Sequence, residues 1–254
     1  MPFPLRAIFD AHLHIIDPRF PLVANGGYLP PAFDCGNYLQ RMRDYPLVGG
    51  AIVSGSFQAF DQSYLLDALE QLGPGFAGVT QLPVNTTDDE LLALNAAGVR
   101  AIRFNLRRGG SENIDHLERM ALRVHELAGW HTELYVDGRD LVGLFETIRA
   151  LPAVSIDHLG LSWAGFKTLL KLAEQGVHVK ATGFGRLDFD PVPALRDIYA
   201  VNPEALMFGT DLPSTRAPRP FADTDARLVI EALGPRAAQR VLHDNAIRFY
   251  RLAA

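Results

Sequence analysis

The sequence predicts a (β/α)8 TIM barrel, and two patterns along the 254-residue chain support this fold class. Short runs rich in Val, Ile, Leu and Phe alternate about eight times with longer amphipathic segments. The short runs show little polar alternation, which is typical of parallel strands covered by helices. Barrels of roughly 250 residues commonly form one unit, so we expect a single domain over residues 1–254.

The expected strands are mostly apolar and become polar only at their C-terminal ends. They span residues 8–15, 50–56, 76–83, 99–106, 131–137, 154–159, 177–183 and 206–211. A doubly wound open sheet is the alternative fold. No Gly-x-Gly-x-x-Gly or phosphate-binding loop follows an expected strand, which favours the barrel.

Several expected helices have recognisable ends, in the form of polar N-caps and terminal glycines. These signals are Asp61 with Gly73, the capping-box pair Thr87 and Glu90, Asn113 with Gly129, and Ser162 with Gly176. The last two helices are expected over residues 224–233 and 235–252. Residues 17–35 are rich in Pro and Gly and follow the first strand, so we expect them to form a lid over the mouth of the barrel.

Composition limits the classes of partner and cofactor. The net charge of −5 gives little support to a nucleic-acid partner. Cys35 is the only cysteine, which excludes an internal disulfide and a cysteine-based zinc site. The N-terminus does not have the form of a signal peptide, and no apolar run reaches the roughly 18 residues of a membrane span. We therefore expect a cytoplasmic protein with no membrane partner, and the sequence leaves its oligomeric state open.

Residues suited to chemistry collect where the expected strands end. His12 and His14 lie two positions apart on the first strand, so their side chains share one face. Catalytic groups in a barrel come from the C-terminal ends of strands and the loops after them. Those ends carry Ser54 and Ser56, Gln81, Arg103 and Asn105, Tyr135 and Asp137, Asp157 and His158, Lys180 and Thr182, and Thr210 and Asp211. Folding alone does not explain so many late polar residues.

Each of these residues also has a structural explanation when it is taken alone. His158 would serve as a hydrogen-bonded core histidine, Asp211 as the cap of a turn, and Tyr135 as core packing. An inward-facing Arg103 would need an anionic partner. The remaining histidines are expected to be structural or exposed, and they are His116, His125, His131, His178 and His243.

Six short motifs occur in order over nearly the whole chain. They are Asp10-Ala11-His12-Leu13-His14, Val99-Arg100-Ala101-Ile102-Arg103-Phe104-Asn105, Asp157-His158-Leu159-Gly160, Val179-Lys180-Ala181-Thr182-Gly183, Phe208-Gly209-Thr210-Asp211-Leu212-Pro213 and Asn245-Ala246-Ile247-Arg248-Phe249-Tyr250. In these motifs the chain resembles the amidohydrolase superfamily, in its amidohydrolase-related (Amidohydro_2) branch. Within that branch it is similar to lactone hydrolases of the 2-pyrone-4,6-dicarboxylate lactonase type.

The resemblance bears on whether a metal is needed. Metal-dependent members of the superfamily use the histidine pair of strand 1, a histidine of strand 5, often one of strand 6, and the aspartate of strand 8. Here Tyr135 stands where the strand-5 imidazole is expected, and Arg103 replaces a bridging lysine or glutamate. The resemblance therefore implies a hydrolase without a cofactor. The alternative is a single divalent metal such as zinc, held by His12, His14 and Asp211.

The resemblance also implies roles for individual residues. Asp211 would activate a water molecule, and His12, His14 and His158 would polarise the substrate carbonyl. A small carboxylate-bearing lactone or related ester would be held by Arg103, Arg108, Arg186 and Arg216, with further hydrogen bonds from Tyr135, Ser56 and Tyr28. Two alternatives stay open. One is a zinc-dependent hydrolase or nonoxidative decarboxylase of the same branch, and the other is a carboxylate-binding protein on an inactive barrel.

Overall fold

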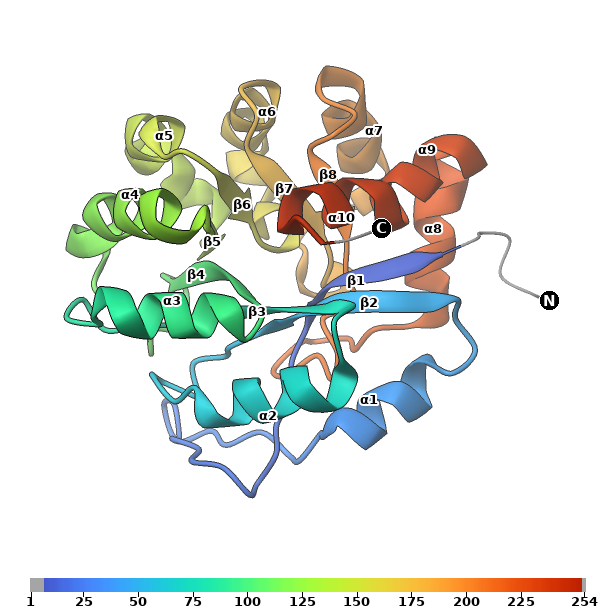
Figure 1. Cartoon of the computed structure of the whole chain (residues 1–254). Helices are drawn as coiled ribbons and strands as arrows, with labels where there is room; N and C mark the ends of the chain where they lie inside the picture. Colours follow the sequence, from blue (N-terminus) through green and yellow to red (C-terminus); the bar gives the residue numbers. More distant parts are fainter. Residues whose placement is uncertain (1–6, 253–254) are drawn as a thin grey trace.

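The computed structural model describes residues 7–252, in which eight parallel strands form a nearly closed barrel (Figure 1). The strands pair in sequence order from β1 to β8. Their bounds are β1 Ile8–Leu13, β2 Leu47–Val53, β3 Phe76–Thr80, β4 Val99–Asn105, β5 His131–Tyr135, β6 Val154–Ile156, β7 His178–Ala181 and β8 Leu206–Phe208. The prediction of a single-domain (β/α)8 TIM barrel is confirmed.

The helices surround the strands, with α1 and α2 below the barrel and α5 to α7 above it in Figure 1. The capping box at Thr87 and Glu90 begins α3, and Gly129 closes α4 in the left-handed conformation, as the sequence predicts. The helices are α1 Cys35–Met42, α2 Ser63–Leu72, α3 Asp88–Ala96, α4 Leu117–Ala128, α5 Leu141–Ala150, α6 Phe166–Glu174, α7 Pro191–Val201, α8 Asp223–Leu233, α9 Pro235–Gln239 and α10 Asn245–Tyr250. No helix among residues 7–252 is long and apolar enough to span a bilayer.

The sequence-based predictions of where the strands end and of one continuous last helix are wrong. Every strand ends one to three residues earlier than expected, so most of the polar residues predicted at strand ends lie in the loops that follow. The physical reason is clearest after β6 and β8, where His158 (φ +52°) and Asp211 (φ +60°) adopt positive φ values that no strand can contain. The single helix expected over 235–252 is α9 and α10, joined by a π-helical turn at Arg240–Asp244.

The barrel has a core on each side of its sheet. Between strands and helices lies a large apolar layer, and a smaller layer fills the barrel interior with Phe9, Val53, Val79 and Met207. The helix α10 covers the N-terminal end of the barrel. There the ring of Phe249 packs against His131 and His178, with centroids 4.1 and 3.9 Å apart, at the starts of β5 and β7. The site is therefore left to the opposite, C-terminal end.

The barrel closes where β8 meets β1. In place of a regular ladder, the described strands are joined by a bridge between Leu13 and Leu212 and by the Asp211 amide, which donates to the His12 carbonyl at 2.7 Å. The buried carboxylate of Asp10 links both sides, because it accepts the Thr210 amide (2.8 Å) and hydroxyl (2.6 Å) and the His12 amide (3.2 Å). This closure sets His12 beside Asp211.

Gly209 permits this close approach. A Cβ atom at this position would lie 2.6 Å from the backbone nitrogen of His12 and 2.8 Å from its Cβ. Real side chains do not approach a backbone this closely, so any other residue would push β8 away from β1.

We expect Gly209→Ala to destabilise the fold by about 1–3 kcal/mol, the usual cost of overpacking, because backbone must move at the closure. The measurement is the free energy of unfolding in urea. Gly143→Ala is the matched control, since Gly143 lies in α5 with nothing within 4 Å of an added Cβ. That control should be neutral or stabilising by up to about 1 kcal/mol. Equal effects at the two positions would contradict the role given to Gly209.

Candidate active site

A pocket opens at the C-terminal end of the barrel. It is lined by every site residue that the sequence predicts except His12, together with other residues that had no predicted role. The lining is His14, Tyr28, Gly55, Ser56, Phe57, Arg103, Asn105, Arg108, Tyr135, His158, Arg186, Asp211, Thr215 and Arg216. His12 lies behind this lining, fully buried.

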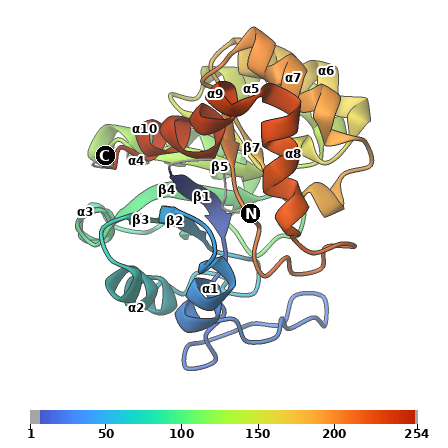
Figure 2. The same ribbon diagram turned by 90° about the vertical axis from the view of Figure 1, so that its right-hand side faces the viewer.

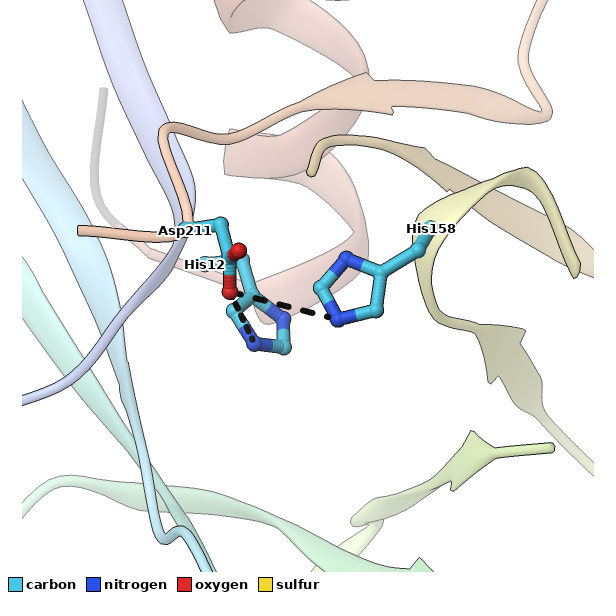
Figure 3. A group of neighbouring side chains, drawn as sticks. All are labelled: His12, His158 and Asp211. Atoms are coloured by element: carbon cyan, nitrogen blue, oxygen red, sulfur yellow. Dashed lines mark ion pairs between the residues drawn. The ribbon is translucent and has the colours of Figure 1, made fainter. Parts of the chain in front are cut away.

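Asp211 is at the centre of the site, surrounded by imidazoles. Its Oδ1 atom lies 3.7 Å from Nε2 of His14 and 3.9 Å from Nε2 of both His12 and His158. Figure 3 shows the Asp211 carboxylate facing the rings of both His12 and His158, which come from β1 and from the turn after β6. The Asp211 Oδ1 and His12 Nε2 atoms are buried and have no hydrogen-bond partner among the described residues. These atoms are therefore available to a bound molecule.

The backbone fixes the tautomer of His14. Its Nδ1 atom lies 2.7 Å from the carbonyl oxygen of Val53, at the end of β2. A carbonyl can only accept, so Nδ1 carries a proton and donates it. In the neutral ring, Nε2 then carries a lone pair and faces Asp211 as an acceptor. The sequence-based expectation that His14 donates to the substrate carbonyl does not fit this neutral form.

Charge and burial set the protonation of the central groups. Burial acts to raise the pKa of Asp211, but the positive charge of Arg186 and the nearby imidazoles outweigh it and hold the pKa well below its usual range. Burial lowers the pKa of His12 to about 4 and also lowers that of His158. At pH 7 the site therefore combines an ionised carboxylate with neutral imidazoles at His12 and His158.

Two of the four predicted arginines are bound to acids. Arg186 donates from Nε to Asp211 Oδ2 at 2.7 Å, and Arg103 donates from Nη2 to Asp157 Oδ2 at 2.7 Å and from Nη1 to the Ser54 carbonyl at 2.6 Å. Both line the pocket, but their charges are already neutralised by these acids. Their predicted role of holding substrate carboxylates stays a prediction, with each guanidinium already paired with an acid.

Arg108 and Arg216 are different, because neither has an ion-pair partner within residues 7–252. Arg108 is exposed at the mouth. Arg216 is held by neutral groups, since it donates to the Asn25 side chain at 3.0 Å and lies over the ring of Tyr28 at 4.4 Å. These two guanidinium groups give the mouth an uncompensated positive charge.

The segment predicted as a lid does reach the mouth of the pocket. Residues 17–34 are irregular, and the helix α1 begins at Cys35, so the loop ends one residue earlier than expected. Asn25 donates to the Arg108 carbonyl at 3.0 Å and accepts from Arg216, while Tyr28 lines the pocket. In Figure 2 this blue segment lies below the barrel, close to the orange loop after β8. Tyr135 meets His158 edge-on with ring centroids 5.1 Å apart, and Ser56 also lines the pocket.

A buried charged cluster below the pocket had no role in the sequence-based prediction. Lys180 donates to Glu133 Oε2 at 2.5 Å, Tyr250 donates to Glu133 Oε1, and His131 Nε2 lies 3.1 Å from Glu133 Oε1. The sequence does contain a signal for this cluster. Glu133 lies two positions before Tyr135 in β5, so both side chains share the inward face of the strand. A glutamate on that face must have a buried cation as partner.

A comparison with known families agrees with this geometry, because an amidohydrolase family model matches residues 9–252. The chain belongs to the amidohydrolase family. It is therefore an enzyme of a hydrolase family, and its site is the C-terminal mouth at which barrel enzymes carry their catalytic groups.

Relatives are similar over nearly the whole chain. A 2-pyrone-4,6-dicarboxylate hydrolase of Comamonas testosteroni is 29% identical, covering 95% of this chain and 89% of that protein. A D-galactarolactone isomerase of Agrobacterium fabrum is 26% identical, covering 99% and 93%. A crystal structure of an Agrobacterium tumefaciens protein superposes with a TM-score of 0.86 at 24% identity, covering 100% and 99%, and shares the barrel fold.

Three side chains of the kinds that bind metal ions meet at this site. His12, His158 and Asp211 can each offer one ligand atom, with all three atoms within 4.8 Å of one another. Two imidazoles and a carboxylate suit a single zinc ion, which would act as a Lewis acid on a carbonyl oxygen. The grouping differs from the predicted set, because His158 takes the place of His14. The residues present therefore fit one divalent ion.

The buried imidazole of His12 makes stability depend on pH. Because the pKa of this imidazole is lowered, the His12 ring binds a proton below pH 6.5 in the unfolded chain but stays neutral in the folded protein. The free energy of unfolding therefore falls as the pH falls from 6.5 to about 4. The shift corresponds to about 3 kcal/mol at the bottom of this window. We expect His12→Gln to reduce this slope in urea unfolding measured between pH 7 and 4.5. The exposed His125→Gln variant is the control, and an unchanged slope in His12→Gln would contradict the assignment.

Proposed function

We propose that this protein hydrolyses a carboxylate-bearing lactone or a related ester, without a metal cofactor. One observation carries the proposal. The free Oδ1 atom of an ionised Asp211 is surrounded by three imidazoles at the base of a pocket whose mouth bears two uncompensated guanidinium groups. Such a site combines a base, hydrogen-bonding groups for a carbonyl oxygen and a binding site for anions.

Asp211 and His14 are suited to hold the attacking water. Oδ1 of the carboxylate and Nε2 of the neutral His14 ring are both acceptors and lie 3.7 Å apart. One water molecule between them can donate a proton to each, which leaves its oxygen lone pair free to attack. As the new C–O bond forms, a water proton passes to Asp211.

His12 and His158 are suited to stabilise the charge that develops on the carbonyl oxygen. Neutral imidazoles that carry the proton on Nε2 would donate to this oxyanion from fixed, buried positions, where such hydrogen bonds are strongest. The ring C–O bond of the lactone then breaks. The proton held by Asp211 moves to the leaving oxygen, so the carboxylate is ready for a second cycle.

Arg108 and Arg216 are suited to bind the substrate's carboxylates. A guanidinium without an acidic partner can offer paired N–H donors to a carboxylate, which matches their spacing. The similarity to a dicarboxylate hydrolase and to a lactone isomerase agrees with a small anionic lactone as the substrate class. The cytoplasmic location expected from the sequence stays a prediction.

The metal-independent reaction is favoured by the cations already present. Arg186 binds the second oxygen of Asp211 at 2.7 Å, and a divalent ion on Oδ1 would lie close to this guanidinium. The alternative is a zinc-dependent hydrolase or nonoxidative decarboxylase. It is supported by the fit of His12, His158 and Asp211 to one ion.

The first test is a turnover screen over lactones of dicarboxylic acids and sulfonated muconolactones, with wild type and Asp211→Asn side by side. Because Asp211 is the base, we expect the variant to lose at least about 100-fold in kcat. Product analysis separates hydrolysis from isomerisation of the lactone.

The same screen includes protein purified with a chelator, and its metal content is measured. Retained activity in protein that contains far less than one metal ion per chain is the expected result. Activity that appears only after zinc is added would overturn the metal-independent proposal in favour of the alternative.

A second prediction concerns anion binding. Arg108→Met removes a charged donor at the mouth, so KM should rise roughly 10- to 100-fold, in line with about 1.5–3 kcal/mol for a charged hydrogen bond, while kcat changes little. Arg107→Met is the control, because Arg107 is the neighbouring exposed residue and does not line the pocket. A similar KM for both variants would remove Arg108 from the binding site.

A further inference from the structure

The reaction proposed above makes no use of Lys180, although this residue lies directly behind the site. Its side chain extends from β7 and is completely buried. The Nζ atom lies 2.5 Å from Glu133 Oε2, 3.4 Å from His12 Nδ1 and 3.8 Å from Asp157 Oδ1. Lys180 is thus the link between the buried cluster and His12.

Fold stability alone does not account for this arrangement. Taking an ammonium and a carboxylate out of water is expensive, and apolar residues of similar size are often as stable or more stable. The Glu133 carboxylate also has other partners, since His131 and Tyr250 both contact its Oε1 atom. A buried lysine that also reaches a site histidine points to a role at that histidine.

Two groups compete for the inner nitrogen of His12. Lys180 Nζ and Asp157 Oδ1 each lie 3.4 Å from Nδ1. An ammonium can only donate, so it favours an unprotonated Nδ1 and a proton on Nε2. An ionised carboxylate can only accept, so it favours the opposite tautomer.

The geometry supports Lys180 in this competition. The Lys180 amine is aligned with Nδ1 as a hydrogen bond, whereas Asp157 Oδ1 accepts no hydrogen bond from the described residues. Asp157 is also held by Arg103, which donates to its other oxygen at 2.7 Å. The ring of His12 is therefore left with its proton on Nε2, the atom that faces Asp211 at 3.9 Å.

We propose that Lys180 is a positioning residue that fixes the Nε2–H tautomer of His12 and so aims an N–H donor into the site. This inference rests on the proposed function for its catalytic consequence, since the N–H would then point to the carbonyl oxygen of the substrate. Such a tautomer also disfavours metal binding through His12, because an Nε2 atom that carries a proton has no lone pair for zinc.

The tautomer can be observed without a substrate. Histidine labelled with ¹⁵N, compared between wild type and His12→Gln to assign the signal, reports which ring nitrogen of His12 carries the proton. We expect Nε2–H in wild type and in the Lys171→Met control, which changes an exposed lysine of α6. In Lys180→Met we expect the Nδ1–H tautomer, since Asp157 is then the remaining partner. Nδ1–H in wild type would overturn the proposal.

Two further measurements separate a positioning role from a structural one. With a lactone substrate, Lys180→Met should reduce kcat by about 100-fold with little change in KM, as for loss of one oxyanion donor. Zinc titrated into the protein should bind at least about tenfold more tightly to Lys180→Met than to wild type, because Nε2 gains its lone pair. Unchanged zinc affinity together with an unchanged tautomer would overturn the proposal.

A variant pair guards against loss of folding. Lys180→Met leaves Glu133 without its cation, so Lys180→Met/Glu133→Gln is made in parallel, with Glu133→Gln as its reference. We expect Glu133→Gln to keep the Nε2–H tautomer and the double variant to lose it. If no lactone is cleaved by wild type but the tautomer follows Lys180, the proposed function fails while the assignment of Lys180 stands.

Discussion

The structure depends on the contact that closes the barrel between β8 and β1. The carboxylate of Asp10 accepts hydrogen bonds from Thr210 on one side and from the His12 amide on the other, and Gly209 allows the backbones to touch. His12 and Asp211 are bonded through their backbones at this same contact. Closing the barrel therefore also assembles the site, because any separation of β8 from β1 would move Asp211 away from His12 and His14.

The charges below and around the pocket follow from this closure. Arg186 is matched by Asp211, Arg103 by Asp157 and Lys180 by Glu133, so each buried cation has its own acid. Charged side chains that are buried away from water require such pairing with an opposite charge. The charges at the mouth follow a different rule, because Arg108 and Arg216 can be hydrated when no anion is bound. In the function proposed above, the boundary between matched and unmatched cations divides the groups that organise the site from those that bind substrate.

The sequence predicted the parts of this arrangement that depend on local order. Alternation along the chain predicted the barrel, and the spacing of His12 and His14 predicted that their rings share a face, 5.0 Å apart in the structure. The pairing of Arg103 and Arg186 with acids could not be predicted, because it joins residues 54 and 25 positions apart. The strands were expected to end later than they do, because apolar composition does not show where φ becomes positive. Glu133 was overlooked because it lies in the middle of β5, whereas the polar residues that predicted the site lie at the ends of strands.

The three histidines show why residue type alone does not decide between metal and hydrogen-bond catalysis. The same imidazole is a ligand or a donor according to which nitrogen carries its proton, and its inner neighbour decides this. For His14 that neighbour is the Val53 carbonyl, which leaves an acceptor facing Asp211. For His12 the neighbours are Lys180 and Asp157, which favour opposite tautomers. Because these neighbours come from other parts of the barrel, the role of each imidazole depends on groups behind the site as well as on those that face the substrate.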